Sequence, residues 1–117
     1  MTGVEIEIGG KSRKLRYDFN AIADIEKAAG LGIGAMFDEN RTGFNSIRLL
    51  VWGGLKWQER GLTVERTGQL VGDYLKDGGS LEELMGKVTD AVTDALRQSG
   101  VIGFQEVEEG NPKAETA

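Results

Sequence analysis

The most apolar stretch of the chain, residues 44–57, constrains the fold more than any other segment. Five of its apolar residues recur at spacings of three and four, which predicts one face of a helix: Phe44, Ile47, Leu50, Val51 and Leu55. Leu49 and Trp52 fall outside this stripe, so the helix is apolar around most of its circumference. Such a helix is typical of the centre of a small domain, with other elements packed on several sides.

Gly53 and Gly54 interrupt the apolar stretch close to its end. A glycine in a helix interior costs about 1 kcal/mol relative to alanine, so the pair needs a structural reason. Either the pair allows another part of the backbone to approach closely, or the helix ends early. The sequence leaves both alternatives open.

The residue types that are absent narrow the available chemistry. The chain has no cysteine and no histidine, which excludes disulfides, thiol nucleophiles, imidazole bases and the common transition-metal sites. A net charge of −5 argues against nucleic acid as the main partner, because phosphate binding requires a basic surface. No apolar run is long enough to span a membrane, and the N-terminus lacks the features of a secretion signal. We therefore expect a single cytoplasmic domain over residues 1–103.

The N-terminal residues 4–17 alternate between apolar and charged side chains, which predicts a β-hairpin. A four-residue loop would place Ile6 opposite Leu15 and give one apolar face and one face of paired charges. A two-residue Gly9-Gly10 turn is the alternative. The basic residues form either a solvated face or a surface for an acidic partner: Lys11, Arg13, Lys14 and Arg16. Two strands alone are marginal, so a helix or another chain must cover the hairpin.

Three further helices are indicated by their ends. Asp18 is a natural N-cap for a helix over residues 19–29, whose buried stripe is Phe19, Ile22 and Ile25. Thr63 is the expected cap of a helix that closes at 77–79. Ser80 and Glu83 form a capping box, the most specific local signal in the chain, and predict a last helix that ends near Gln98.

A glycine-rich segment follows the first of these helices. Residues 30–35 match a variant of the dinucleotide-binding pattern, which requires a preceding strand and a following helix. The segment follows a helix here, so a glycine-rich helix exit is the favoured interpretation. The wider segment 30–43 predicts a loop or short turn that places Met36 and Phe37 against the core.

Two groups of acidic residues could either bind a metal or act in catalysis, or have only a structural role. Residues 38–43 resemble the first half of a calcium loop, but the position that requires a glutamate is Leu49, so a polar loop is favoured. Asp90 and Asp94 share a helix face opposite the apolar stripe. This placement favours a solvated face over an acid–base pair.

The two tryptophans and the C-terminal segment bear on partners. Trp52 and Trp57 are either core residues or partner anchors, with core favoured, and Trp57 is the more exposed of the two in our interpretation. Residues 104–117 carry four glutamates against one lysine, together with the only proline. We expect this segment to be an acidic, flexible tail.

The order of several segments resembles the small phage tail assembly chaperones, including those of the gene-transfer-agent type. The likeness covers residues 4–98 and lies in segments 8–11, 15–26, 47–55, 62–63 and 74–80. The resemblance implies a mostly helical protein that binds the tape measure protein and keeps it soluble while tail tube protein polymerises around it. It also implies self-association into spiral oligomers, and no catalytic residues.

We therefore predict a non-enzymatic tail assembly chaperone of a phage, prophage or gene transfer agent, without cofactor or metal. The predicted fold is α+β and mostly α, with an N-terminal hairpin and about four helices around the central one. The candidate partner or self-association surface consists of Trp57, Lys14, Arg16, Tyr17, Gly53 and Gly54. The alternatives are a structural tail or head–tail connector subunit retained in the virion, and a small enzyme or ligand-binding domain.

Overall fold

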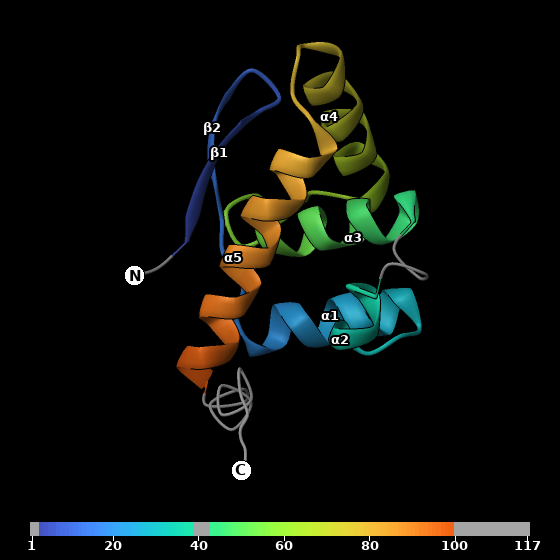
Figure 1. Ribbon diagram of the computed structural model, residues 1–117, viewed down its shortest axis with the longest axis vertical. Coiled ribbons are helices and arrows are strands. Elements are labelled where there is room, and N and C mark those ends of the chain that lie inside the picture. The colour runs from blue at the N-terminus through green and yellow to red at the C-terminus, as the bar shows by residue number, and fades with distance from the viewer. Residues whose placement is uncertain (1–2, 39–42, 100–117) are drawn as a thin grey trace.

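A computed structural model of the chain describes residues 3–38 and 43–99 (Figure 1). The elements in chain order are β1 (Val4–Ile8), β2 (Lys11–Leu15), α1 (Phe19–Ala29), α2 (Ile33–Met36), α3 (Phe44–Leu55), α4 (Val64–Lys76) and α5 (Leu81–Ser99). The fold is α+β and mostly α, which confirms the predicted class. The predicted acidic tail, 104–117, and residues 39–42 of the candidate calcium loop lie outside the described residues.

Helix α3 is the centre of the fold, as its apolar circumference predicted. It contacts α1, α4, α5 and strand β2, so neighbours cover it on several sides (Figure 1). Leu50, Val51 and Leu55 are fully buried along it. Within residues 3–38 and 43–99, every helix is too short or too polar to cross a lipid bilayer.

Two aromatic residues that the helical spacing placed in the core are exposed instead. Phe44 is 80% exposed and Phe19 is 70% exposed. Each is the first residue of its helix. Side chains on a helix lean toward its N-terminus, so a residue in this position projects past the end of the packed surface. The prediction that Phe19 and Phe44 are core residues was wrong for this reason.

The glycine pair of α3 marks a close approach, and the helix continues to Leu55. A Cβ atom on Gly54 would lie 2.7 Å from the Tyr17 ring, and one on Gly53 would overlap the Ile25 side chain. The carbonyl of Gly54 also accepts a hydrogen bond of 2.9 Å from the Arg16 amide. The end of the hairpin is therefore bonded directly to the α3 backbone. Of the two alternatives for the pair, close approach is correct and early termination is wrong.

The hairpin has the two-residue turn, so the four-residue loop was wrong. Gly9 and Gly10 have φ values of 67° and 81°, which glycine adopts without strain. The resulting register pairs Ile6 with Arg13 and Val4 with Leu15. Arg13 therefore lies on the inner face of the sheet and is 7% exposed. Helices α4 and α5 contact β1, while α3 and α5 contact β2, which supplies the cover that a two-stranded sheet requires.

The helix ends follow the local signals in the sequence. The three predicted caps form, since Asp18 accepts from the Ala21 amide at 2.7 Å, Thr63 from Arg66 at 3.0 Å and Ser80 from Glu83 at 3.0 Å. Gly30 ends α1 in the left-handed conformation, with a φ of 73°. The predicted inward residue Met36 is fully buried at the end of the short α2, and Phe37 packs against the core.

Candidate functional site

A cleft of about 680 Å³ opens where the end of β2, the first turns of α1 and the C-terminal end of α3 meet. Both tryptophans of the chain line it, Trp52 half-buried and Trp57 38% exposed. Five charged residues also line it: Arg16, Asp18, Asp24, Lys56 and Arg60. Aromatic rings and charged groups therefore meet in one concave site, as in many binding clefts.

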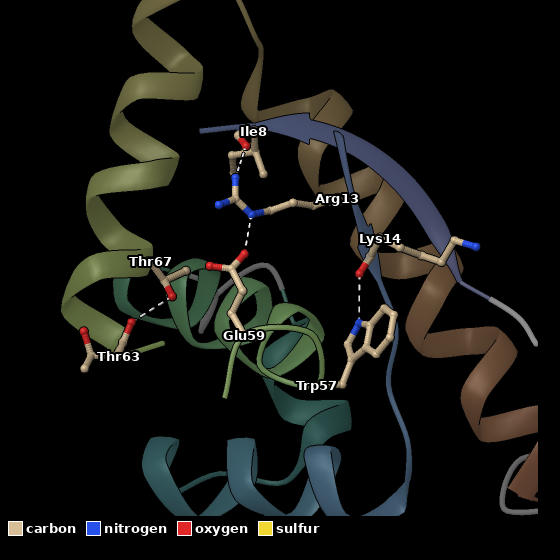
Figure 2. A network of polar contacts seen from close by, with 7 residues as sticks. All are labelled: Ile8, Arg13, Lys14, Trp57, Glu59, Thr63 and Thr67. Atoms are coloured by element: carbon tan, nitrogen blue, oxygen red, sulfur yellow. Dashed lines mark hydrogen bonds and ion pairs between the residues drawn. The ribbon is translucent and has the colours of Figure 1, made fainter. Parts of the chain in front are cut away.

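Trp57 is held against the hairpin by its edge. Its indole Nε1–H donates a hydrogen bond of 3.0 Å to the Lys14 carbonyl (Figure 2). The Arg16 guanidinium lies over the ring, 5.1 Å from its centroid, which is a cation–π contact. The ring is thus fixed in position, while 38% of the residue stays exposed.

Trp52 joins the segment after α3 to the helix itself. Its Nε1–H donates a hydrogen bond of 3.0 Å to the Leu62 carbonyl, ten positions later. The Lys56 ammonium lies 4.6 Å from the centroid of the ring and also forms an ion pair with Asp24 of α1. The favoured core assignment fits Trp52, which packs against the core cluster. Trp57 is the more exposed of the two, as predicted.

The structure brings part of the predicted surface together at this cleft. Trp57, Arg16 and Gly53 line it. Lys14 contributes its backbone carbonyl to Trp57, and its side chain is half-buried.

The other two residues of the predicted surface are buried. Gly54 lies under Tyr17 and Leu15. Tyr17 is 6% exposed, and its hydroxyl donates a hydrogen bond of 2.6 Å to the Leu50 carbonyl. Burial raises the pKa of Tyr17 above its usual value. Placing Tyr17 and Gly54 on a partner surface was wrong, because both are needed inside the monomer to join the hairpin to α3.

A partly buried ion pair positions the segment that carries Trp57. Arg13 donates from Nε to Glu59 Oε2 at 2.5 Å, and from its terminal nitrogen to the Ile8 carbonyl (Figure 2). The hydrogen bond from Arg13 lowers the pKa of Glu59 below its ordinary value. Because Glu59 lies between Trp57 and Arg60, this pair anchors one wall of the cleft to the hairpin. Arg13 was therefore wrongly placed with Lys11, Lys14 and Arg16 on an outer basic face.

Sequence reasoning missed several residues of the cleft. Lys56, Arg60 and Asp24 come from α1 and from the segment after α3, and their spacing in the sequence does not connect them. The one available signal was local, because Arg60 follows Trp57 within a short polar segment. The contact between α1 and α3 is what brings the set together.

The carboxylates of the cleft are engaged in structural contacts. Asp18 accepts the capping hydrogen bond of α1, and Asp24 pairs with Lys56. Elsewhere, Asp90 is exposed and Asp94 half-buried on α5. Among the described residues, no group of three acidic side chains is placed to hold a metal ion. The cleft offers aromatic faces and guanidinium donors, which suit the binding of a polypeptide.

The glycine-rich segment is a helix exit. Gly30 is the C-cap of α1, and the Ile33 amide donates a hydrogen bond of 2.6 Å to Glu26 Oε2. The amide that would face a pyrophosphate therefore already donates to a carboxylate. The helix that follows, α2, spans only four residues. This geometry agrees with the favoured interpretation over nucleotide binding.

Comparisons with known proteins identify no relative of this chain. A scan against protein-family models, a search of curated proteins and a search of solved structures each gave no match.

Proposed function

We propose that the protein is a non-enzymatic tail assembly chaperone of a long-tailed phage, prophage or gene transfer agent, acting in the host cytoplasm. In this proposal it binds the tape measure protein, assists polymerisation of the tail tube protein and associates with copies of itself. The resemblance of residues 4–98 to that family supports the proposal, and so does the order of a hairpin followed by helices.

The observation that best supports the proposal is that Trp57 is held in place and partly exposed. Its N–H is satisfied within the molecule, while 38% of the residue remains exposed beside a concave site. A ring that is already fixed loses little side-chain freedom on binding, and tryptophan is enriched among the residues that dominate interface energy. Such a ring suits an apolar segment of another polypeptide.

Two further aromatic side chains are exposed outside the cleft. Phe19 begins α1 and Phe44 begins α3, and both are largely exposed. Tape measure proteins are long and apolar, so a protein that holds one needs exposed aromatic surface rather than a catalytic centre. The engagement of Asp18 and Asp24 in structural contacts fits a binding role.

The test is co-expression with an insoluble tape measure protein. We expect the wild-type chain to move the tape measure protein into the soluble fraction, and Trp57→Ala to reduce that fraction several-fold. Arg48→Ala is the control, because Arg48 is exposed on helix α3 and lies outside the cleft. Circular dichroism of each variant verifies that the fold is intact.

Two results would contradict the proposal. The first is a tape measure protein that stays insoluble with the wild-type chain. The second is recovery of the protein from purified particles at fixed stoichiometry, which would favour the structural tail or connector subunit.

A further inference from the structure

The cleft is locally basic in a chain whose net charge is −5. Of its three cations, Lys56 is neutralised by Asp24. Arg16 stacks on Trp57, and neither it nor Arg60 forms an ion pair within residues 3–38 and 43–99. The Asp18 carboxylate accepts a hydrogen bond from the Ala21 amide of α1. The cleft therefore presents guanidinium groups beside indole rings, which fits a ligand that combines carboxylates with apolar side chains.

The chain carries a segment of this chemistry in residues 104–109, Phe-Gln-Glu-Val-Glu-Glu. The segment supplies one aromatic residue, one aliphatic residue and three carboxylates. Its carboxylates are complementary in sign to Arg16 and Arg60.

The helix that precedes this segment, α5, contacts a helix that lines the cleft. Helix α5 ends at Ser99 and contacts α1, and Figure 1 shows the end of α5 close to the beginning of α1. Asn20 and Ala21, at the beginning of α1, line the cleft. Phe104 is five residues beyond Ser99, a distance of up to about 17 Å for an extended chain.

We propose that residues 104–109 dock into the tryptophan-lined cleft of the same chain. Phe104 and Val107 pack against the indole rings, and the glutamates pair with Arg16 and Arg60. Exposed ion pairs are individually weak, but the tether raises the effective concentration of the segment to the millimolar range. Under the proposed function, the docked segment would compete with a partner for the cleft. The docking itself does not depend on that function.

The two tryptophans provide a direct readout, because they are the only ones in the chain and both line the cleft. The experiment measures acrylamide quenching of tryptophan fluorescence in the full-length protein at low salt. Reversing Glu106, Glu108 and Glu109 to lysine should increase the quenching constant about twofold, because the segment leaves the cleft. Adding about 1 M NaCl should raise quenching of the wild type to a similar level.

A charge swap separates docking from a general effect of charge. Arg60→Glu leaves the stacking of Arg16 on Trp57 unchanged and, combined with the three lysines, should restore protection. Equal quenching of the wild type and the triple lysine variant would overturn the proposal. Protection that increases with protein concentration, together with a dimer in size-exclusion chromatography, would overturn docking within one chain and place the segment in a second copy. No tape measure protein is used, so failure of the proposed function would not affect the result.

Discussion

Arg13 on the hairpin donates a hydrogen bond of 2.5 Å to Glu59, 46 positions later in the sequence. Arg13 is 7% exposed, whereas the Glu59 side chain is 31% exposed, so the guanidinium is the more deeply buried partner. A buried charge is costly unless it is paired and hydrogen-bonded. Arg13 can therefore point inward only when the segment that carries Trp57 and Glu59 packs against the hairpin.

Glu59→Ala should lower the free energy of unfolding by about 2 kcal/mol, because it leaves the buried guanidinium of Arg13 without its carboxylate. Urea denaturation followed by circular dichroism measures the change. Glu7→Ala is the control, since Glu7 is exposed on the outer side of the hairpin, and we expect a change within about 0.5 kcal/mol. Equal effects of the two substitutions would contradict a stabilising role for the pair.

The same pair should make stability depend on pH in the acidic range. Arg13 holds the pKa of folded Glu59 below its ordinary value of 4.5. For a lowered pKa, the contribution to stability is complete above the unfolded value and is lost as pH falls through the folded value. The stability advantage of the wild type over Glu59→Gln should be constant near pH 7 and decline below about pH 4.5. Urea denaturation of both proteins across this range measures it, and an advantage that persists undiminished near pH 3 would argue against the assignment.

Gly54→Ala should destabilise the protein by about 1–3 kcal/mol, although alanine is the better helix former. The added Cβ would lie 2.7 Å from the ring of Tyr17, which is held by its hydrogen bond to Leu50. Gly72→Ala makes the same substitution on the exposed side of α4, where nothing lies within 4 Å of the added atom. This control should gain about 0.5–1 kcal/mol. Thermal melts of the two variants should move in opposite directions, and a shift of the same sign would refute the close approach.

The sequence was a good guide to helix ends because the chemistry of a cap is local. Asp18, Thr63 and Ser80 each accept from an amide three residues later, and such a pattern can be recognised without knowledge of the fold. It was a poor guide to the hairpin register. Placing Arg13 on the inner face becomes favourable only when Glu59 is supplied from a distant segment.

The candidate site was predictable in part for a similar reason. Composition drew attention to Trp57, and its partial exposure was correctly predicted. Periodicity cannot show where neighbouring elements end, which explains the error at Phe19 and Phe44. The contribution of Lys56 and Arg60 depends on the packing of α1 against α3, a tertiary contact that has no local signature.

Tyr17→Phe tests the bond that fixes the end of the hairpin to the central helix. The Tyr17 hydroxyl donates to the Leu50 carbonyl at 2.6 Å, and phenylalanine fills the same space without it. We expect a loss of about 1 kcal/mol near pH 7, measured by urea denaturation. Tyr74→Phe is the control, because the Tyr74 hydroxyl makes no hydrogen bond within residues 3–38 and 43–99, and it should change stability by less than about 0.5 kcal/mol.

The pH dependence of the Tyr17→Phe effect provides a second check on burial. Burial raises the pKa of the Tyr17 phenol above its ordinary value of 10.0. For a raised pKa, the contribution to stability is complete below the unfolded value and is lost as pH rises through the folded value. The advantage of the wild type over Tyr17→Phe should therefore shrink above about pH 10, because the unfolded chain gains stability by ionising the phenol. An advantage that is unchanged at high pH would mean that the phenol ionises as readily in the folded protein as in the unfolded one, which is incompatible with its buried position against α3.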